Sequence, residues 1–121
     1  MENDLVDFSV LDKLSGGDKQ YFHDVINIFI DATTKSIEKL KILVENDDNH
    51  LEVSSVAHSI KSGVGIVQVK GLLDELISVE KLAKEKENMN AARQHMQKAI
   101  HIFETALPVL KNEKKKNKPR T

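Results

Sequence analysis

Apolar residues recur every three or four positions along most of this chain, which is the spacing of amphipathic helices. The pattern is most regular near the C-terminus, where steps of four and three connect Ala92, Met96, Ala99, Phe103, Ala106 and Leu110. No segment shows the sustained alternation that is typical of a half-buried strand. The first proline is Pro108, so no proline interrupts the helical pattern before that residue. The pattern therefore predicts an all-α protein.

The first two helices are separated by a glycine pair. A short helix is expected over 8–14, and Ser15-Gly16-Gly17 ends it. Asp18 can then cap a long helix that continues to about Asn46. The apolar stripe of this helix has a polar break at Ser36 and consists of Phe22, Val25, Phe29, Ala32, Leu40 and Leu43.

Three further helices follow a polar turn at 46–49. The third is expected over 51–69, and Gly71 breaks or kinks the chain before the fourth. A turn and cap at 88–90 precede the last helix, which Pro108 should kink or fray near its end. Four amphipathic helices with short turns predict an antiparallel up-and-down four-helix bundle with a short extra N-terminal helix. In the third and fourth helices, the residues expected to face the core are Val53, Val56, Ile60, Val64 and Val67, then Leu72, Leu73, Leu76, Val79, Leu82 and Ala83.

Composition narrows the setting in which such a bundle would work. The chain has 121 residues and no cysteine, which suits one domain without disulfides in a reducing compartment. Its first ten residues carry acids where a secretory signal carries bases. The apolar run VINIFI is far shorter than the roughly 20 residues that span a bilayer. We therefore expect a soluble, cytoplasmic, monomeric protein that does not bind a membrane.

Charge is unevenly distributed along the chain. Residues 111–121 hold six bases and one acid. Without them the 18 bases and 19 acids of the chain become 12 and 18, which is a net charge of −6 for residues 1–110. An acidic body is a poor surface for nucleic acid. We therefore expect one domain over 1–110, followed by a basic, disordered tail over 111–121.

The third predicted helix carries a histidine among small residues, in the stretch VAHSIKSGVG over 56–65. At about 100° per residue, His58 points roughly 140° away from Val53, the middle of the apolar stripe, so it should be exposed. Gly63 points sideways, where it would let a neighbouring helix approach closely. The face around His58 is expected to be cleared for contact with a partner, and it comprises Ser54, Ser55, Lys61, Ser62 and Gly65.

An exposed imidazole beside an ammonium group is suited to accepting a phosphoryl group. A neutral imidazole is a nucleophile, and Lys61, one turn from His58, would disfavour the imidazolium and later offset the phosphoryl charge. The chain has no Gly-rich phosphate loop and no evident metal cluster. We therefore expect no cofactor and no kinase or hydrolase activity of its own, so that an already phosphorylated partner must deliver the group.

The residues AHSIKSG over 57–63 resemble the motif of the histidine-containing phosphotransfer (HPt) family, usually written Ala-His-x-Leu-Lys-Gly. The resemblance covers most of the chain, since 11–40 looks like the entry and first long helix of that family, and 72–85 looks like the helix after the histidine helix. It implies a four-helix bundle that relays phosphoryl groups between aspartates of receiver domains in a two-component phosphorelay. By the same resemblance, these receivers belong to response regulators or hybrid sensor histidine kinases. Any Mg²⁺ that the transfer needs is expected on the receiver and not on this chain. By this resemblance His58 is the phosphoryl acceptor and Lys61 is its charge partner.

Two positions depart from the family pattern. Ser62 stands where a glycine most often follows the lysine, and this change leaves the surface small. Gln68 stands ten residues after the histidine, where a glycine is usual. The second departure bears on how closely the end of this helix packs and on which receiver fits.

Two other functions fit the same sequence. One is a helical adaptor that binds a receiver-like partner without chemistry, and the other is the phosphotransfer module of a larger hybrid sensor kinase. The remaining histidines are interpreted as ordinary surface residues, because no pair at His-x-x-x-His spacing suggests a metal site. They are His23, His50, His95 and His101.

Overall fold

The structure, a computed structural model, describes residues 5–45, 49–85 and 88–117, so the predicted turn at 46–48 lies outside it. Within the described residues nearly all regular structure is helical, which confirms the all-α prediction. No helix in this part of the chain has both the length and the apolar character needed to cross a membrane. The elements are, in chain order, β1 (Val6–Asp7), α1 (Ser9–Ser15), α2 (Lys19–Leu43), α3 (His50–Val64), β2 (Gln68–Val69), α4 (Leu72–Glu85) and α5 (Met89–Lys116).

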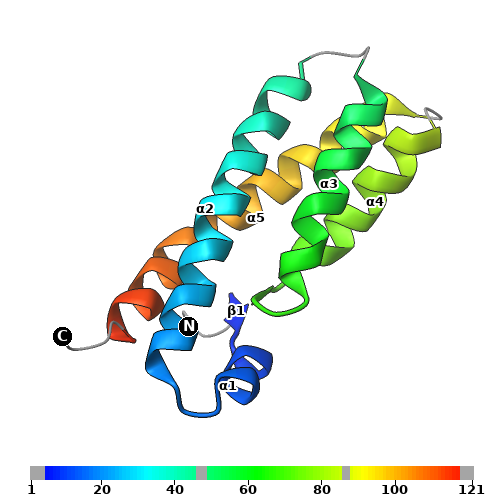
Figure 1. Ribbon diagram of the computed structural model, residues 1–121. Coiled ribbons are helices and arrows are strands. Elements are labelled where there is room, and N and C mark those ends of the chain that lie inside the picture. The colour runs from blue at the N-terminus through cyan, green and yellow to red at the C-terminus, as the bar shows by residue number, and fades with distance from the viewer. Residues whose placement is uncertain (1–4, 46–48, 86–87, 118–121) are drawn as a thin grey trace.

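The four longer helices pack around one core. Consecutive helices from α2 to α5 run in alternating directions, and β1 and α1 lie near the N-terminal end of α2 (Figure 1). Helix α3 packs against α2 on one side and α4 on the other, and α5 packs against both α2 and α4. The outward face of α3 is therefore left uncovered by the rest of the described chain.

The helix boundaries follow local capping signals. The Asp18 carboxylate accepts a hydrogen bond from the Tyr21 backbone N–H at 3.1 Å, and Asn88 accepts one from Ala91 N–H at 3.0 Å. Gly71, at φ 86°, supplies the left-handed turn that precedes α4. These three residues act where the sequence predicts the caps and the break.

The core residues of α5 are predicted correctly, but the buried face of α2 is rotated from the expected one. All six residues of the α5 stripe are buried. In α2, however, Val25 is only half-buried and Ala32 is exposed. The predicted break at Ser36 is absent, because Thr33 and Ile37 on an adjacent face are buried and continue the stripe past that residue. The buried residues of α2 are Phe22, Ile26, Phe29, Ile30, Thr33, Ile37, Leu40 and Leu43.

Two residues of the predicted α4 stripe also lie outside the core, the exposed Leu73 and the half-buried Leu82. Leu73 is 41% exposed, although its neighbour Leu72 is fully buried. Two adjacent positions on a helix point about 100° apart, so α4 can bury only one of them against the same neighbour.

The predicted helix over 51–69 ends earlier than expected, at Val64. After a turn, β2 pairs with β1 in an antiparallel register that places Val69 opposite Val6. Lys70 N–H also donates to the Leu5 carbonyl at 2.9 Å. The prediction is wrong at this end because the partner strand comes from the N-terminus of the chain, which local periodicity cannot reveal.

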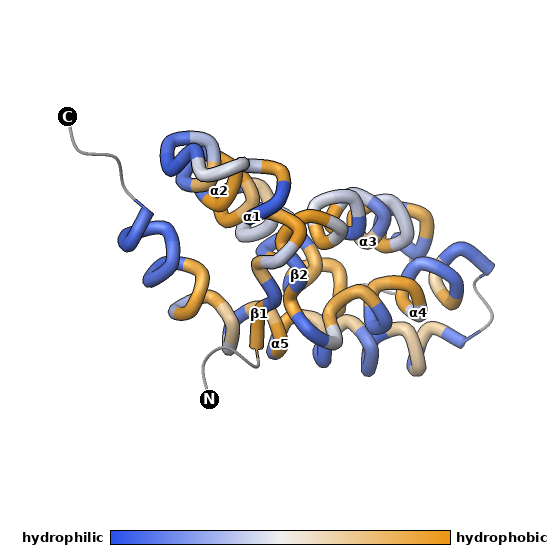
Figure 2. The backbone as a smooth tube through the Cα atoms, turned by 90° about the horizontal axis from the view of Figure 1, so that it is seen from below, coloured by the Kyte–Doolittle hydropathy of each residue, from blue (hydrophilic) through white to orange (hydrophobic). Residues whose placement is uncertain are grey.

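The expected disordered tail is corrected for residues 111–116, which continue α5 as helix past Pro108. The C-terminal turns of α5 are hydrophilic (Figure 2) but not free of contacts. Lys114 Nζ donates to the Asn27 side-chain oxygen at 3.0 Å, and His23 Nδ1 donates to the Lys114 carbonyl at 3.1 Å. These bonds to α2 hold the basic end of the helix against the protein.

Candidate functional site

His58 lies on the outward face of α3, where helical geometry predicts it. Its side chain is 71% exposed. The residues that surround it in sequence and point the other way, Val56, Ala57 and Ile60, are buried in the core. The imidazole is therefore carried by a helix whose opposite face is buried in the core, while the ring itself remains accessible.

The structure separates the serines that the sequence places beside His58. Ser55 and Ser62 are exposed, and Ser62 Oγ donates to the Ser59 carbonyl at 2.8 Å. Ser54 is buried instead, and its hydroxyl donates to the Glu80 carbonyl of α4 at 3.3 Å. Its predicted exposure is wrong because α4 packs against this side of α3. Ser54 therefore joins two helices and is not available to a partner.

Two side chains of α3 converge on a carboxylate that the sequence analysis did not select. Glu80 Oε2 lies 3.1 Å from His58 Nδ1, and Glu80 Oε1 lies 2.7 Å from Lys61 Nζ. A signal for Glu80 exists in the sequence, since it follows the buried Leu76 by four residues and precedes the buried Ala83 by three. A carboxylate at that spacing lies along the packed side of its helix and needs a partner there.

The surroundings of Glu80 favour its charged form. The hydrogen bond from Lys61 lowers the pKa of Glu80 below the usual 4.5, burial opposes that shift, and the bond with His58 adds to it. Lys81 and Lys84 line the same surface hollow as Lys61 and Glu80. The carboxylate is therefore ionised at neutral pH and lies in a region rich in lysine.

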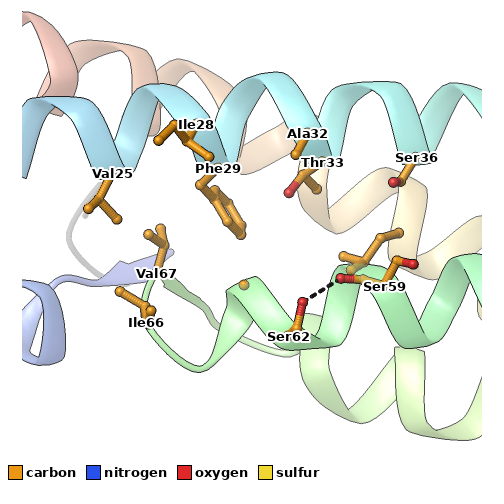
Figure 3. A pocket seen from close by; sticks show the side chains of 12 residues that line it. Val25, Ile28, Phe29, Ala32, Thr33, Ser36, Ser59, Ser62, Ile66 and Val67 are labelled. Atoms are coloured by element: carbon orange, nitrogen blue, oxygen red, sulfur yellow. Dashed lines mark hydrogen bonds between the residues drawn. The ribbon is translucent and has the colours of Figure 1, made fainter.

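The opposite side of α3 borders an apolar groove of about 290 Å³ between α3 and α2. Figure 3 shows Phe29 pointing from α2 toward α3, with Ser59 on the α3 side of the groove. Val25 and Ala32, which the sequence assigns to the core, line this groove instead. Ile28 also lines it and is 65% exposed. An accessible apolar surface thus lies next to the outward face of α3.

The two glycines of the stretch over 56–65 have different roles. A β-carbon at Gly63 would lie 3.0 Å from Phe29 Cδ1, so this glycine allows the α2 ring to pack closely, as predicted. Gly65 caps the end of α3 and is not inside the helix as expected. A β-carbon there would have the Ser62 carbonyl oxygen, at 4.0 Å, as its nearest neighbour. No packing within the described residues therefore requires position 65 to be small.

A second His-x-x-Lys sequence, His95 to Lys98, lies on α5. His95 Nδ1 is 2.5 Å from Glu75 Oε2 of α4, so this histidine also has a carboxylate on its δ nitrogen. The His95 side chain is only 30% exposed, against 71% for His58. The two histidines therefore differ in accessibility more than in their local motif.

The other histidines form no site with these two. His50 Nδ1 donates to the Ala83 carbonyl at 3.2 Å, and His101 is exposed on α5. Across residues 5–45, 49–85 and 88–117, no group of three or more histidine and acidic side chains is placed to hold a metal ion.

Two solved structures with a similar fold are named as histidine-containing phosphotransfer proteins. One from maize matches with a TM-score of 0.71 and 20% identity, over 97% of this chain and 85% of its own. A rice protein described as a histidine-containing phosphotransfer protein matches with a TM-score of 0.67 and 19% identity, over 93% and 79%. No family model matches the chain, and no curated protein matches its sequence. The resemblance to the HPt family is therefore confirmed at the level of the fold.

The Glu80→Gln substitution should lower the free energy of unfolding at neutral pH, because an amide cannot form the ion pair with Lys61. Since the pKa of Glu80 is lowered in the folded state, its stabilising contribution is present above the usual 4.5 and is lost as pH falls through the folded-state pKa. The difference between wild type and variant, measured by urea denaturation, should therefore shrink below about pH 4.5. Asp31→Asn, which removes an exposed carboxylate of α2, is the control. A Glu80→Gln effect that does not change with pH would contradict the ion pair.

Proposed function

We propose that this protein is a phosphorelay intermediate, in which His58 accepts a phosphoryl group from a receiver-domain aspartate and passes it to another receiver. The observation that carries the proposal is the 71% exposure of His58 on a helix face with small neighbours and Lys61 one turn away. The fold supports it, because both similar structures are named as histidine-containing phosphotransfer proteins. The receivers would belong to response regulators or hybrid sensor histidine kinases.

The transfer forms one bond and breaks one. The unshared pair of His58 Nε2 attacks the phosphorus of the aspartyl phosphate, and the P–O bond to the aspartate breaks as its electron pair leaves with the carboxylate. The reverse step on a second receiver regenerates the imidazole. Phosphoryl transfer depends mainly on positioning and charge stabilisation, and the receiver with its Mg²⁺ supplies most of both. This chain supplies the nucleophile and the ammonium group of Lys61.

The receiver would dock over the outward face of α3. Small residues there, Ser55, Ser62 and Gly65, allow a partner backbone to approach the imidazole. The groove beside Ile28 offers apolar contact area on one side of that face. Lysines 61, 81 and 84 on the other side would attract the acidic, phosphorylated site of a receiver.

We further propose that α2 to α5 act as an antiparallel up-and-down four-helix bundle, and that the protein works as a monomeric domain in the cytoplasm. Helix α2 packs against one flank of α3 and helix α4 against the other, and together they hold α3 in place. A site carried on such a helix keeps its geometry when a partner binds.

Two alternatives make different predictions for one experiment. In this experiment the protein is incubated with a radiolabelled phosphorylated receiver, and the label is tested for stability. Acid-labile, alkali-stable label indicates phosphohistidine, whereas binding without label indicates a non-catalytic adaptor. A module of a larger hybrid kinase would carry out the same chemistry, so this experiment does not distinguish it from a free protein. The genes adjacent to this one would distinguish the two.

His58→Gln should abolish phosphoryl acceptance while leaving the helical content unchanged, because the side chain is exposed. The matched control is His95→Gln, which removes the less exposed histidine of the second His-x-x-Lys sequence and should accept label at the wild-type rate. Incorporated label measures phosphoryl acceptance, and circular dichroism measures helical content. Label that persists on the His58→Gln protein would exclude His58 as the acceptor.

Lys61→Ala should slow transfer by about tenfold, which corresponds to about 1.4 kcal/mol. It removes a charge that stabilises the phosphoryl group but leaves the nucleophile in place. Single-turnover transfer from a phosphorylated receiver measures the rate. Lys81→Ala, which removes a neighbouring ammonium group outside the motif, should have a smaller effect, and equal rates for Lys61→Ala and wild type would contradict a role for Lys61.

Gly65→Glu should impair receiver-dependent transfer much more than phosphorylation by phosphoramidate, which needs no docked partner. The new side chain would project into the space that the partner occupies and would add a negative charge there. Because position 65 is open, the free energy of unfolding should change by less than about 0.5 kcal/mol. Gly65→Ala adds little bulk and should transfer at nearly the wild-type rate. If Gly65→Glu slowed both donors equally, or strongly destabilised the fold, the docking role of this face would be rejected.

A further inference from the structure

The carboxylate of Glu80 contacts both side chains that the proposed transfer uses. Its two oxygens are divided between them, Oε2 at 3.1 Å from His58 Nδ1 and Oε1 at 2.7 Å from Lys61 Nζ. The Glu80 side chain is only 23% exposed. The Ser54 hydroxyl, bonded to the Glu80 carbonyl, fixes the backbone at this point of α4 against α3. Glu80 is therefore held in place from two directions.

This geometry determines which nitrogen of His58 carries the proton. An ionised carboxylate only accepts hydrogen bonds, so Nδ1 must be the donor in its bond with Glu80. In a neutral imidazole the second nitrogen, Nε2, then has the unshared pair. Because Nδ1 faces Glu80 and the side chain is 71% exposed, Nε2 is the nitrogen left for a partner.

We propose that Glu80 is a positioning residue for phosphoryl transfer, which accepts the Nδ1 proton of His58, leaves Nε2 unprotonated and outward, and holds Lys61 one turn away. The proposal rests on the proposed function, since it states how the acceptor nitrogen of that reaction is selected. Without this carboxylate the imidazole could carry its proton on Nε2, where no unshared pair would remain to attack.

Glu80 also balances charge during the step. When Nε2 forms its bond to phosphorus and the P–O bond of the aspartyl phosphate breaks, Nδ1 keeps its proton and the ring becomes cationic. The adjacent carboxylate stabilises that cation. Lys61, paired with the other oxygen of the same carboxylate, would meet the incoming phosphoryl oxygens. The same contacts serve the reverse transfer.

The chain contains an internal control for this assignment. His95 Nδ1 has the same kind of bond, to Glu75, but that pair belongs to α5 and α4 and lies outside the proposed site. Removing the Glu75 carboxylate should therefore change which ring nitrogen of His95 carries the proton, and it should leave the protonated nitrogen of His58 unchanged.

The test is ¹⁵N NMR of the unphosphorylated full chain at a pH well above the usual histidine pKa of about 6.5, where ring shifts report the tautomer. His58 should be protonated at Nδ1 in wild type. Glu80→Leu, which keeps the side-chain volume but accepts no hydrogen bond, should move that proton to Nε2. Glu80→Gln, whose amide oxygen can still accept, should retain the Nδ1 tautomer. Glu75→Leu should change the tautomer of His95 only.

Phosphorylation by phosphoramidate gives the functional part of the test. Its rate should fall about tenfold in Glu80→Leu, fall less in Glu80→Gln, and stay unchanged in Glu75→Leu. Helical content measured for each variant checks that the fold is kept.

Two results would overturn the proposal. One is a wild-type His58 ring protonated at Nε2, and the other is a Glu80→Leu protein with unchanged tautomer and rate. Failure of the proposed function is a separate result, because it would leave the wild-type chain without label from any donor. The tautomer measurement needs no phosphorylation and still decides whether Glu80 orients the ring.

Discussion

Glu80 reaches from α4 to α3 and places one carboxylate oxygen on His58 and the other on Lys61. This shared carboxylate depends on the close packing of the two helices, which the bond from Ser54 to the Glu80 backbone fixes. The proposed chemistry uses an imidazole and an ammonium from one helix, but their orientation comes from the other. A small displacement of α4 would therefore alter the site without touching the nucleophile.

The other flank of α3 is fixed by a different contact. Gly63 gives the Phe29 ring room to pack from α2, and the groove beside that contact stays open to solvent. Helix α3 is thus held on both sides while its outward face remains free for a partner. This arrangement separates stability, which comes from the buried face, from the proposed recognition, which would use the small residues around His58.

Sequence reasoning succeeded where a feature depends on neighbouring residues. The stripe of α5, the caps Asp18 and Asn88, and the exposure of His58 all follow from spacing within one helix. It failed where distant segments meet. Ser54 is buried because α4 covers it, and the helix with His58 ends at Val64 because the chain then pairs with an N-terminal strand.

The contribution of Glu80 and the helical state of the C-terminal region belong to the second kind. Glu80 lies 22 residues from His58, so only the packing of α4 on α3 brings them together. Residues 111–116 look like a solvated basic tail, yet the Lys114 bonds to α2 hold them as the last turns of α5.

The most direct measurement of the central claim is a phosphorus–nitrogen correlation spectrum of the ¹⁵N-labelled protein after phosphorylation. The account predicts one phosphorus signal, coupled to Nε2 of His58. A signal coupled to Nδ1 of His58, or to another histidine, would contradict it.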